Sequence, residues 1–350
     1  MSVETSSNHN STSLGLDIAT FPLQGRKGLI SNADRDIYFA LNFVVICGAI
    51  SVFGVTANVI NIVNFWRQGF ADSVNLSLVG LSLSDLGCLL TLIYNNSLMS
   101  PWLAFSDVSP FFPFEVQYLT GGWPHVWFTR VTSWITAYIA LERCLCIALP
   151  LKVKQLLTPF RSRVIILSIF LLTAASIAPV YYTTRLAWRF SEKRNKSLLG
   201  LAFTSDREEI DDVILAINNV FSPVASFFTV IGCTVILVVK LNSKAKWRES
   251  AVSSMEAVKS GRDNRVVKMV VTISVIFIVS YTPTTVIFLT VIMVPELSIT
   301  GRYQNLFNVL FSFSFIFEAI NSSINIFVYI RMSSKYRQTF NMMCWCRSSQ

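Results

Sequence analysis

The sequence predicts an all-α membrane protein: a bundle of seven transmembrane helices and a short amphipathic eighth helix, with the N-terminus outside. Two observations predict this class. Only 14% of the 350 residues are charged and the mean hydropathy is +0.54, whereas an average globular domain has about 25% charged residues. Seven apolar runs also exceed the length that crosses a bilayer, which is about 20 residues. The runs cover 37–66, 73–104, 116–141, 164–184, 213–239, 269–295 and 303–330.

Lipid favours helices here, because isolated strands leave their backbone groups unpaired in hydrocarbon. A membrane barrel would need alternating segments of about 10 residues, and the sequence has none. With the N-terminus outside, the inner segments carry 18 Lys and Arg against 5 Asp and Glu, which fits the positive-inside rule. Topology therefore explains the net charge of +9, and no nucleic-acid partner is expected.

The chain divides into three parts on this basis. We expect an extracellular N-terminal tail at 1–36, a seven-transmembrane domain at 37–331, and an amphipathic helix with a short cytoplasmic tail at 332–350. The last part is predicted to be amphipathic because its large apolar residues fall on one helical face, which would suit the inner leaflet. These residues are Met332, Tyr336, Phe340 and Met343.

Two kinds of covalent modification are predicted. Asn10 and Asn195 begin glycosylation sequons in segments expected outside the membrane. Cys344 and Cys346 follow the last span closely and are candidates for palmitoylation, with two unmodified thiols as the alternative.

Three spans each carry one ionisable residue: Asp85, Arg130 and Glu318. Such residues are costly in a bilayer, at about 2.5–3.5 kcal/mol each on insertion scales, and commonly mark function. Arg130 precedes Arg143 by 13 residues and Glu318 precedes Tyr329 by 11, so both charges lie roughly 16–20 Å from the inner face. We expect these two to face the interior, where they either pair with each other or bind a ligand. A buried ion pair that only fixes helix packing is the alternative.

Short motifs follow in a fixed order along the later spans. Glu142-Arg143 ends the third span, Pro223 lies in the fifth, and Phe277 to Pro283 lies in the sixth. The seventh span contains Asn321-Ser-Ser-Ile-Asn325 and ends in Tyr329. Together these residues resemble the rhodopsin-like (class A) G-protein-coupled receptors over roughly 37–346. The stretch 134–146 also resembles a divergent invertebrate branch, that of molluscan chemosensory or neuropeptide receptors.

The resemblance implies roles for particular residues. Glu142 and Arg143 would form the switch that meets a heterotrimeric G protein, and Arg143 would pair with Asp263 at rest. Asn325 and Tyr329 would belong to the same switch. Pro223, Phe277 and Pro283 would form hinges, with Tyr281 in place of the usual hinge tryptophan. A buried polar network would hold sodium as an allosteric ligand, with no other cofactor; its residues are Asp85, Thr132, Asn321, Ser322 and Asn325.

The chain departs from the family pattern at its outer end. Tyr118 stands where a cysteine is usual, and the loop 184–212 has no cysteine to pair with it. We therefore expect no disulfide there. A hairpin of 186–190 with 198–203 would cover the pocket but would be less firmly tethered.

We expect a plasma-membrane receptor for an extracellular peptide or small chemosensory molecule, contacted by His125, Arg130, Tyr281 and Glu318. Amine receptors place an aspartate where His125 stands, so an amine ligand is not expected; His125 could instead face lipid headgroups. The rival class is a transporter or channel with Asp85, Arg130 and Glu318 along a polar path. No sequence motif of an intramembrane enzyme is present.

Overall fold

The computed structural model describes residues 29–100, 103, 108–148, 158–192, 194–249, 256–298 and 301–345. Within these residues, seven helical segments are long and apolar enough to cross a membrane. Each one corresponds to a predicted run, so the seven-helix class is confirmed. The spans are Asn32–Gln68, Ser73–Met99, Pro113–Ala148, Pro159–Thr183, Arg207–Ser243, Arg265–Met293 and Gln304–Met332.

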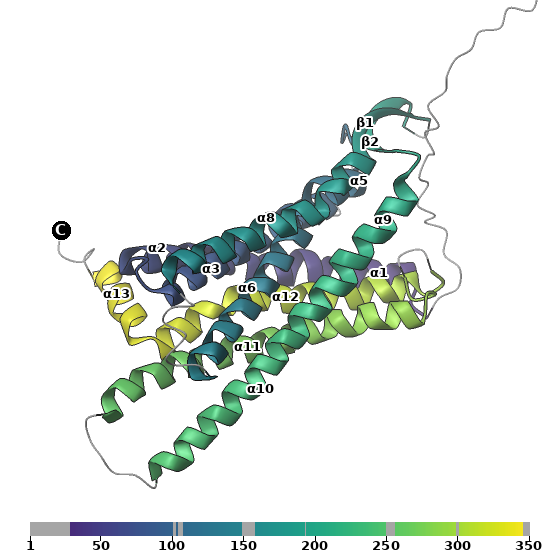
Figure 1. The fold of residues 1–350 in the computed structure, drawn as a ribbon. Helices are drawn as coiled ribbons and strands as arrows, with labels where there is room; N and C mark the ends of the chain where they lie inside the picture. The colour runs from purple at the N-terminus through teal and green to yellow at the C-terminus, as the bar shows by residue number, and fades with distance from the viewer. Residues whose placement is uncertain are drawn as a thin grey trace, which may run out of the picture.

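The first, third and fifth spans each consist of three consecutive helical elements, and Figure 1 labels the helices. The elements in chain order are α1 (Asn32–Phe39), η1 (Ala40–Cys47), α2 (Gly48–Gln68), α3 (Ser73–Met99), α5 (Pro113–Gln117), η2 (Tyr118–Gly122), α6 (Trp123–Ala148), α8 (Pro159–Thr183), β1 (Thr184–Ser191), β2 (Lys196–Phe203), α9 (Arg207–Leu215), η3 (Ala216–Phe221), α10 (Ser222–Glu249), α11 (Glu256–Met293), α12 (Gln304–Met332) and α13 (Ser334–Trp345).

Three of the spans contain a π-helical segment: η1 in the first, η2 in the third and η3 in the fifth. The third of these has a local cause. Pro223 is the second residue after η3 and has no N–H to donate to the carbonyl of Asn219, so the regular α-helical ladder is interrupted there. The hydropathy pattern did not predict these segments, because an added residue in one turn barely changes the apolar stripe.

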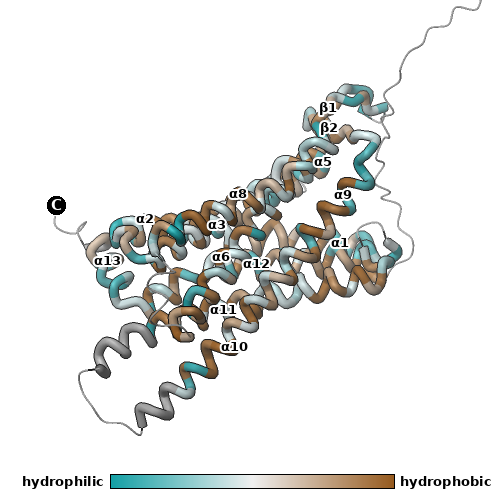
Figure 2. The backbone as a smooth tube through the Cα atoms, viewed as in Figure 1, coloured by the Kyte–Doolittle hydropathy of each residue, from teal (hydrophilic) through white to brown (hydrophobic). Residues whose placement is uncertain are grey.

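The third span occupies the middle of the bundle. Its helix α6 contacts α3, α8, α10 and α11, and Figure 1 shows it crossing between them. Large apolar side chains remain on the outer faces, such as Leu172, which is 71% exposed. Figure 2 shows hydrophobic residues along the helices. Exposed apolar surface of this extent suits contact with lipid tails.

The predicted hairpin is confirmed, and its extracellular placement stays a prediction. Strands β1 and β2 form a two-stranded antiparallel sheet in which Leu186 pairs with Leu201. The turn contains Asn195 with a φ of 47°, a left-handed conformation that asparagine tolerates better than most residues. The strands therefore follow directly from α8 and return the chain to α9.

Non-covalent bonds fasten this hairpin to the segment before the third span. Both carboxylate oxygens of Glu115 on α5 accept from Arg189 at 2.6 Å, and one of them also accepts from the Leu201 backbone N–H at 2.6 Å. Phe112 donates to the Leu199 carbonyl at 2.9 Å, and Leu199 donates to the Pro110 carbonyl at 3.0 Å. These non-covalent bonds tether the hairpin where no disulfide is expected, and the expectation that it is less firmly tethered than with a disulfide stays a prediction.

Helix α13 packs against the bundle through Tyr336, which is fully buried. The Tyr336 ring lies 5.2 Å from that of Phe65 and 5.5 Å from that of Tyr329, and its hydroxyl donates to Asn61 Oδ1 at 2.6 Å. Burial raises the pKa of the Tyr336 hydroxyl, which keeps it a donor. Tyr336 thus faces α2 and α12 and not the leaflet, and the placement of α13 on the membrane stays a prediction.

Candidate functional site

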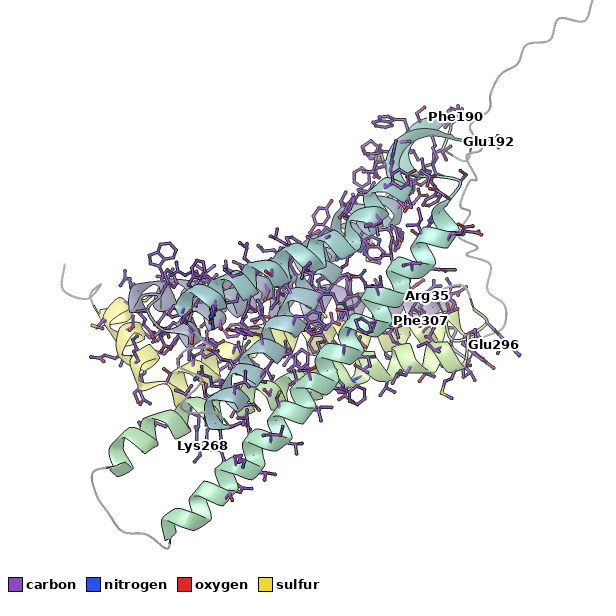
Figure 3. All side chains as sticks on the ribbon, viewed as in Figure 1. Arg35, Phe190, Glu192, Lys268, Glu296 and Phe307 are labelled. Carbon is purple, nitrogen blue, oxygen red and sulfur yellow. The ribbon has the colours of Figure 1, made fainter. Side chains whose placement is uncertain are left out.

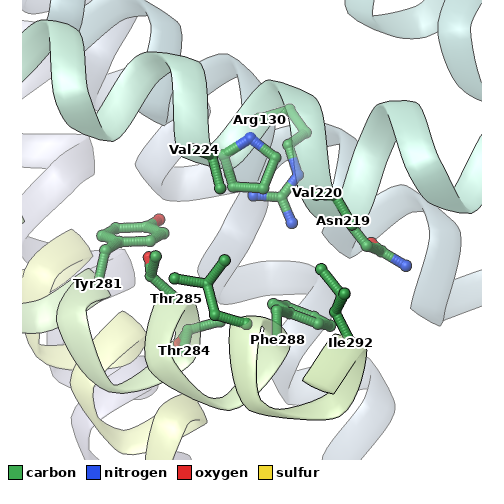
Figure 4. Close-up of a pocket in the computed structure, with 11 residues that line it drawn as sticks. Arg130, Asn219, Val220, Val224, Tyr281, Thr284, Thr285, Phe288 and Ile292 are labelled. Carbon is green, nitrogen blue, oxygen red and sulfur yellow. The ribbon is translucent and has the colours of Figure 1, made fainter. Parts of the chain in front are cut away.

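A narrow pocket of about 10 Å³ lies between α6, η3, α10 and α11. Figure 4 shows the Arg130 side chain reaching toward it from α6, with Tyr281 and Thr285 across the gap on α11. The complete lining is Arg130, Asn219, Val220, Pro223, Val224, Tyr281, Thr284, Thr285, Phe288, Leu289 and Ile292. The lining is therefore mostly apolar, with one cation and a few hydroxyl groups.

Two polar atoms of this pocket are buried without a hydrogen-bond partner. Arg130 is only 5% exposed, and its Nε has no partner among the described residues. The Thr284 hydroxyl on α11 is in the same condition. Leaving such groups unpaired costs about 1–3 kcal/mol each, and more for a charged one, so native proteins rarely do so. The two atoms belong to different helices and border the same space.

Glu318 is engaged elsewhere. Its Oε2 lies 3.2 Å from Nε2 of His125, and the other ring nitrogen lies 3.2 Å from the Thr91 hydroxyl and 3.3 Å from the Cys88 carbonyl. Glu318 is close enough to Arg130 for electrostatic attraction, but the structure has no direct ion pair between them. His125 is 6% exposed, so the alternative that places it among lipid headgroups is wrong.

Of the predicted hinge residues Pro223, Phe277 and Pro283, only Pro223 lines the pocket, together with Tyr281. Tyr281 stacks on Phe277 with ring centroids 4.4 Å apart, and both rings are buried. Helix α11 continues through Pro283, which has no N–H for the carbonyl of Val279. Pro223 lies opposite, at the start of α10. Pro283 itself is not a lining residue, but the next residue, Thr284, is.

Asp85 lies in a separate polar cluster, fully buried between α3, α6 and α12. Thr132 donates to its Oδ1 at 3.1 Å, and Asn325 donates to its Oδ2 at 2.9 Å. Ser322 contributes another hydrogen bond. Asn321 is buried as well, but no bond joins it to Asp85 among the described residues. The cluster was predicted from the sequence, and its members do meet around the carboxylate.

The oxygens of Asp85, Thr132 and Ser322 are hard donors, which suit an ion such as sodium. No group of three or more His, Cys, Asp or Glu side chains gathers among the residues searched. The donor chemistry therefore fits an alkali cation and gives no support to a transition-metal centre.

At the inner end of α6, Arg143 Nη2 lies 3.0 Å from Glu142 Oε1. Ser73 donates to the same carboxylate oxygen at 2.6 Å, which ties this pair to the start of α3. Tyr329 is fully buried nearby in the core cluster that contains Leu78, Ile139 and Tyr336. The guanidinium is therefore turned toward its neighbour in this structure.

Several predicted positions lie outside the described residues: Asn10, Cys346 and the side chains of Asp263 and Cys344. Asn195 is described and is exposed at the hairpin turn, where a glycan would have room. The sequence reasoning missed Asn219, Thr284 and Thr285 as pocket residues. Their signal is weak, because threonine in a helix commonly bonds its own backbone, as Thr282 does with Ile278.

Seven membrane-spanning helices, an acid–arginine pair at the inner end of the third and a pocket in the outer half define a seven-transmembrane receptor. A family model described as "Serpentine type 7TM GPCR chemoreceptor Srw" matches residues 42–347, and the chain belongs to this family. It is a multi-pass G-protein-coupled receptor of the plasma membrane for an extracellular ligand, and not an enzyme.

The match confirms the receptor class, while the rhodopsin-like and molluscan assignments receive no specific support from it. No curated protein matches the chain. Nothing found supports the transporter or channel alternative.

Proposed function

We propose that this receptor detects a small ligand with an anionic group, such as a carboxylate, which the Arg130 guanidinium binds. One observation carries the proposal: a buried cation with an unpaired Nε and a buried, unpaired Thr284 hydroxyl border the same pocket. An anionic ligand would satisfy both groups at once. Charge-assisted bonds of this kind are short and about twice as strong as neutral ones.

The size and charge of the pocket narrow the ligand class. The cavity is about 10 Å³ in this arrangement, room for little more than one water molecule, so the lining side chains would have to move to admit a ligand, which favours a small molecule over a folded peptide. The apolar lining, including Phe288 and Leu289, would accept a short hydrocarbon part. Amines are disfavoured, because the nearest acid, Glu318, already pairs with His125.

In this mechanism the ligand acts on α11. A carboxylate held by Arg130 on α6 would also reach Thr284 and Thr285, and would draw the two helices together at their outer halves. Pro283 weakens the backbone ladder one turn away, so the inner half of α11 can move separately. The ligand shifts the equilibrium only by its higher affinity for the active arrangement.

The inner end would respond through Arg143. Release of its guanidinium from Glu142 would present a cation to a heterotrimeric G protein. In the resting state Arg143 is expected to pair also with Asp263 on α11, so Asp263→Ala should raise basal signalling. If sodium binds, Asp85 and Thr132 would hold it, and it would supply a counter-charge to the carboxylate.

The test uses cells that express the receptor, a promiscuous Gα and a calcium reporter. Small carboxylic acids and amino acids are applied beside their methyl esters, which differ only in charge. The acids should activate and the esters should not. Arg130→Gln should reduce potency roughly 10- to 100-fold, from a charged bond of about 1.5–3 kcal/mol. Arg130→Lys should restore part of it, and Arg302→Gln, at an exposed outer site, should change nothing.

Equal potency of acid and ester, or an unchanged response in Arg130→Gln, would contradict the proposal. Arg143→Ala is run in parallel to test coupling. It should abolish the calcium signal while cell-surface expression persists, because it removes the cation that the G protein meets.

A further inference from the structure

We infer that the inner ends of α11, α12 and α13 form a binding site for the phosphorylated headgroup of an anionic membrane lipid. This inference is independent of the ligand proposed above. It begins with a second concavity of about 360 Å³, lined by Arg265, Lys268, Arg331, Met332, Ser334 and Arg337. Four of these six residues are cations. Figure 3 labels Lys268 near the inner end of α11.

Within the part of the chain whose side chains the structure describes, none of the four cations has an acidic partner. Among the described residues no ion pair includes any of them, and Arg265 donates only to the Ser334 hydroxyl, at 3.2 Å. Like charges held close together repel each other unless a counter-ion is present. A polyanion would relieve that repulsion, and a phosphate accepts bonds from guanidinium groups in bidentate geometry.

The start of α13 adds to the same site. Ser334 is the first residue of this helix, whose N-terminal end carries a partial positive charge that favours anions. The Ser333 hydroxyl already accepts from Tyr336 N–H at 3.2 Å, and this bond fixes the first turn. A helix end of this kind, surrounded by four cations, is suited to phosphate.

The position of the concavity on α11 indicates that a phosphate bound there belongs to a membrane lipid. Arg265, Lys268 and Thr272 continue one helical face that further along contains Val275 and Val279, which are 46% and 61% exposed. These two valines belong to a membrane-spanning segment, so their face meets acyl chains. The interior face of α11, which includes Val270 and Phe277, is buried in the bundle and points elsewhere.

Helix α12 gives the same result. Arg331 lies one turn after Phe327 and in line with Phe313, and these rings are 56% and 41% exposed. Two lipid-facing stripes therefore end in one basic concavity at the membrane border. A headgroup could enter it while its acyl chains remain against α11 and α12. A G protein that meets Arg143 would approach the interior of the bundle instead.

The test measures lipid retention by the purified full-length receptor. Receptor is reconstituted in vesicles of phosphatidylcholine with phosphatidylinositol 4,5-bisphosphate, with phosphatidylserine, or with neither, and bound lipid is counted by native mass spectrometry. The phosphoinositide should be retained best. The double variant Arg265→Gln/Arg337→Gln should lose at least tenfold of this binding, and Arg265→Lys/Arg337→Lys should keep most of it. The matched control is Arg67→Gln/Lys240→Gln, which removes two exposed cations of the same membrane side outside the concavity.

Three outcomes would overturn the inference. Equal retention by the glutamine double variant and the wild type would remove the site. Equally tight binding of soluble inositol trisphosphate, which has no acyl chains, would assign the concavity to a free phosphate compound. Unchanged lipid retention with impaired nucleotide exchange on a G protein would assign it to a protein partner.

Discussion

Asp85 and Arg130 are both buried charges inside the same bundle, yet their surroundings differ. Asp85 accepts from Thr132 and Asn325 through separate oxygens and has Ser322 as another donor. Arg130 borders a pocket with its Nε unpaired, and the nearest acid, Glu318, is bonded to His125.

This difference separates two uses of charge in a membrane. A charge whose partners are all supplied by the protein holds helices in register, since breaking the set leaves several buried groups unpaired. A buried charge with an unpaired donor carries a desolvation cost, and a ligand that bonds to the donor offsets that cost. Asp85 should therefore matter most for the stability of the fold, and Arg130 for the response to ligand.

The largest effect on stability is expected at the satisfied charge. Asp85→Ala leaves Thr132 and Asn325 without their acceptor and should destabilise the receptor by roughly 3 kcal/mol. Asp85→Asn should cost less, because its amide oxygen can still accept. The melting temperature of the detergent-solubilised receptor checks both, and equal melting of Asp85→Ala and wild type would break the comparison.

The unpaired charge should behave in the opposite way. Arg130→Met removes a buried cation that costs about 2.5–3.5 kcal/mol to place in a bilayer, and fills similar volume. We expect an unchanged or higher melting temperature, with a gain of up to about 2 kcal/mol, together with loss of the ligand response. A marked drop in melting temperature would show that Arg130 is a structural group after all.

A smaller effect is expected where α13 meets α2. Tyr336→Phe keeps the buried ring but removes the hydroxyl that donates to Asn61 Oδ1, so it should cost about 1 kcal/mol. Tyr336→Ala should cost several times more, because it also removes a fully buried ring. The melting temperatures of the two variants separate the hydrogen bond from the packing of the ring. Tyr336→Phe melting like the wild type would contradict the bond, and equal losses in both variants would contradict the packing.

The smallest effect is expected at the extracellular hairpin. Arg189→Gln weakens the pair with Glu115, which is partly exposed to solvent, so less than about 1 kcal/mol should be lost. Hydrogen exchange should become faster in β1 and β2 while the helices keep their protection. Unchanged exchange in the hairpin would mean that the backbone bonds at Leu199 hold it without the ion pair.

Much of the fold was predictable from the sequence because it follows from local properties. Hydropathy located all seven spans, since each must present apolar residues to lipid. The hairpin was predicted from two apolar strands around a polar turn. The partners of Asp85 were predicted from the resemblance to a receptor family, because the motif residues of that family are known to lie close together in the folded bundle.

The errors came from information that a one-dimensional argument lacks. The rise per residue places Arg130 and Glu318 at similar depth, but it does not give the rotation of each helix, and the acid turned to His125. The π-helical turns shift rotation further, and hydropathy is insensitive to them. The Glu115–Arg189 pair joins residues 74 positions apart, so no local pattern predicts it.

The way the hairpin is fastened has a consequence for the surroundings in which the receptor works. A disulfide would tie the loop to redox conditions, whereas an ion pair with backbone bonds is indifferent to reducing agents. It is sensitive to ionic strength, because salt screens exposed charges over about 10 Å at 0.1 M. The β1–β2 hairpin should therefore be held less firmly at high ionic strength and more firmly at low ionic strength, independently of any ligand.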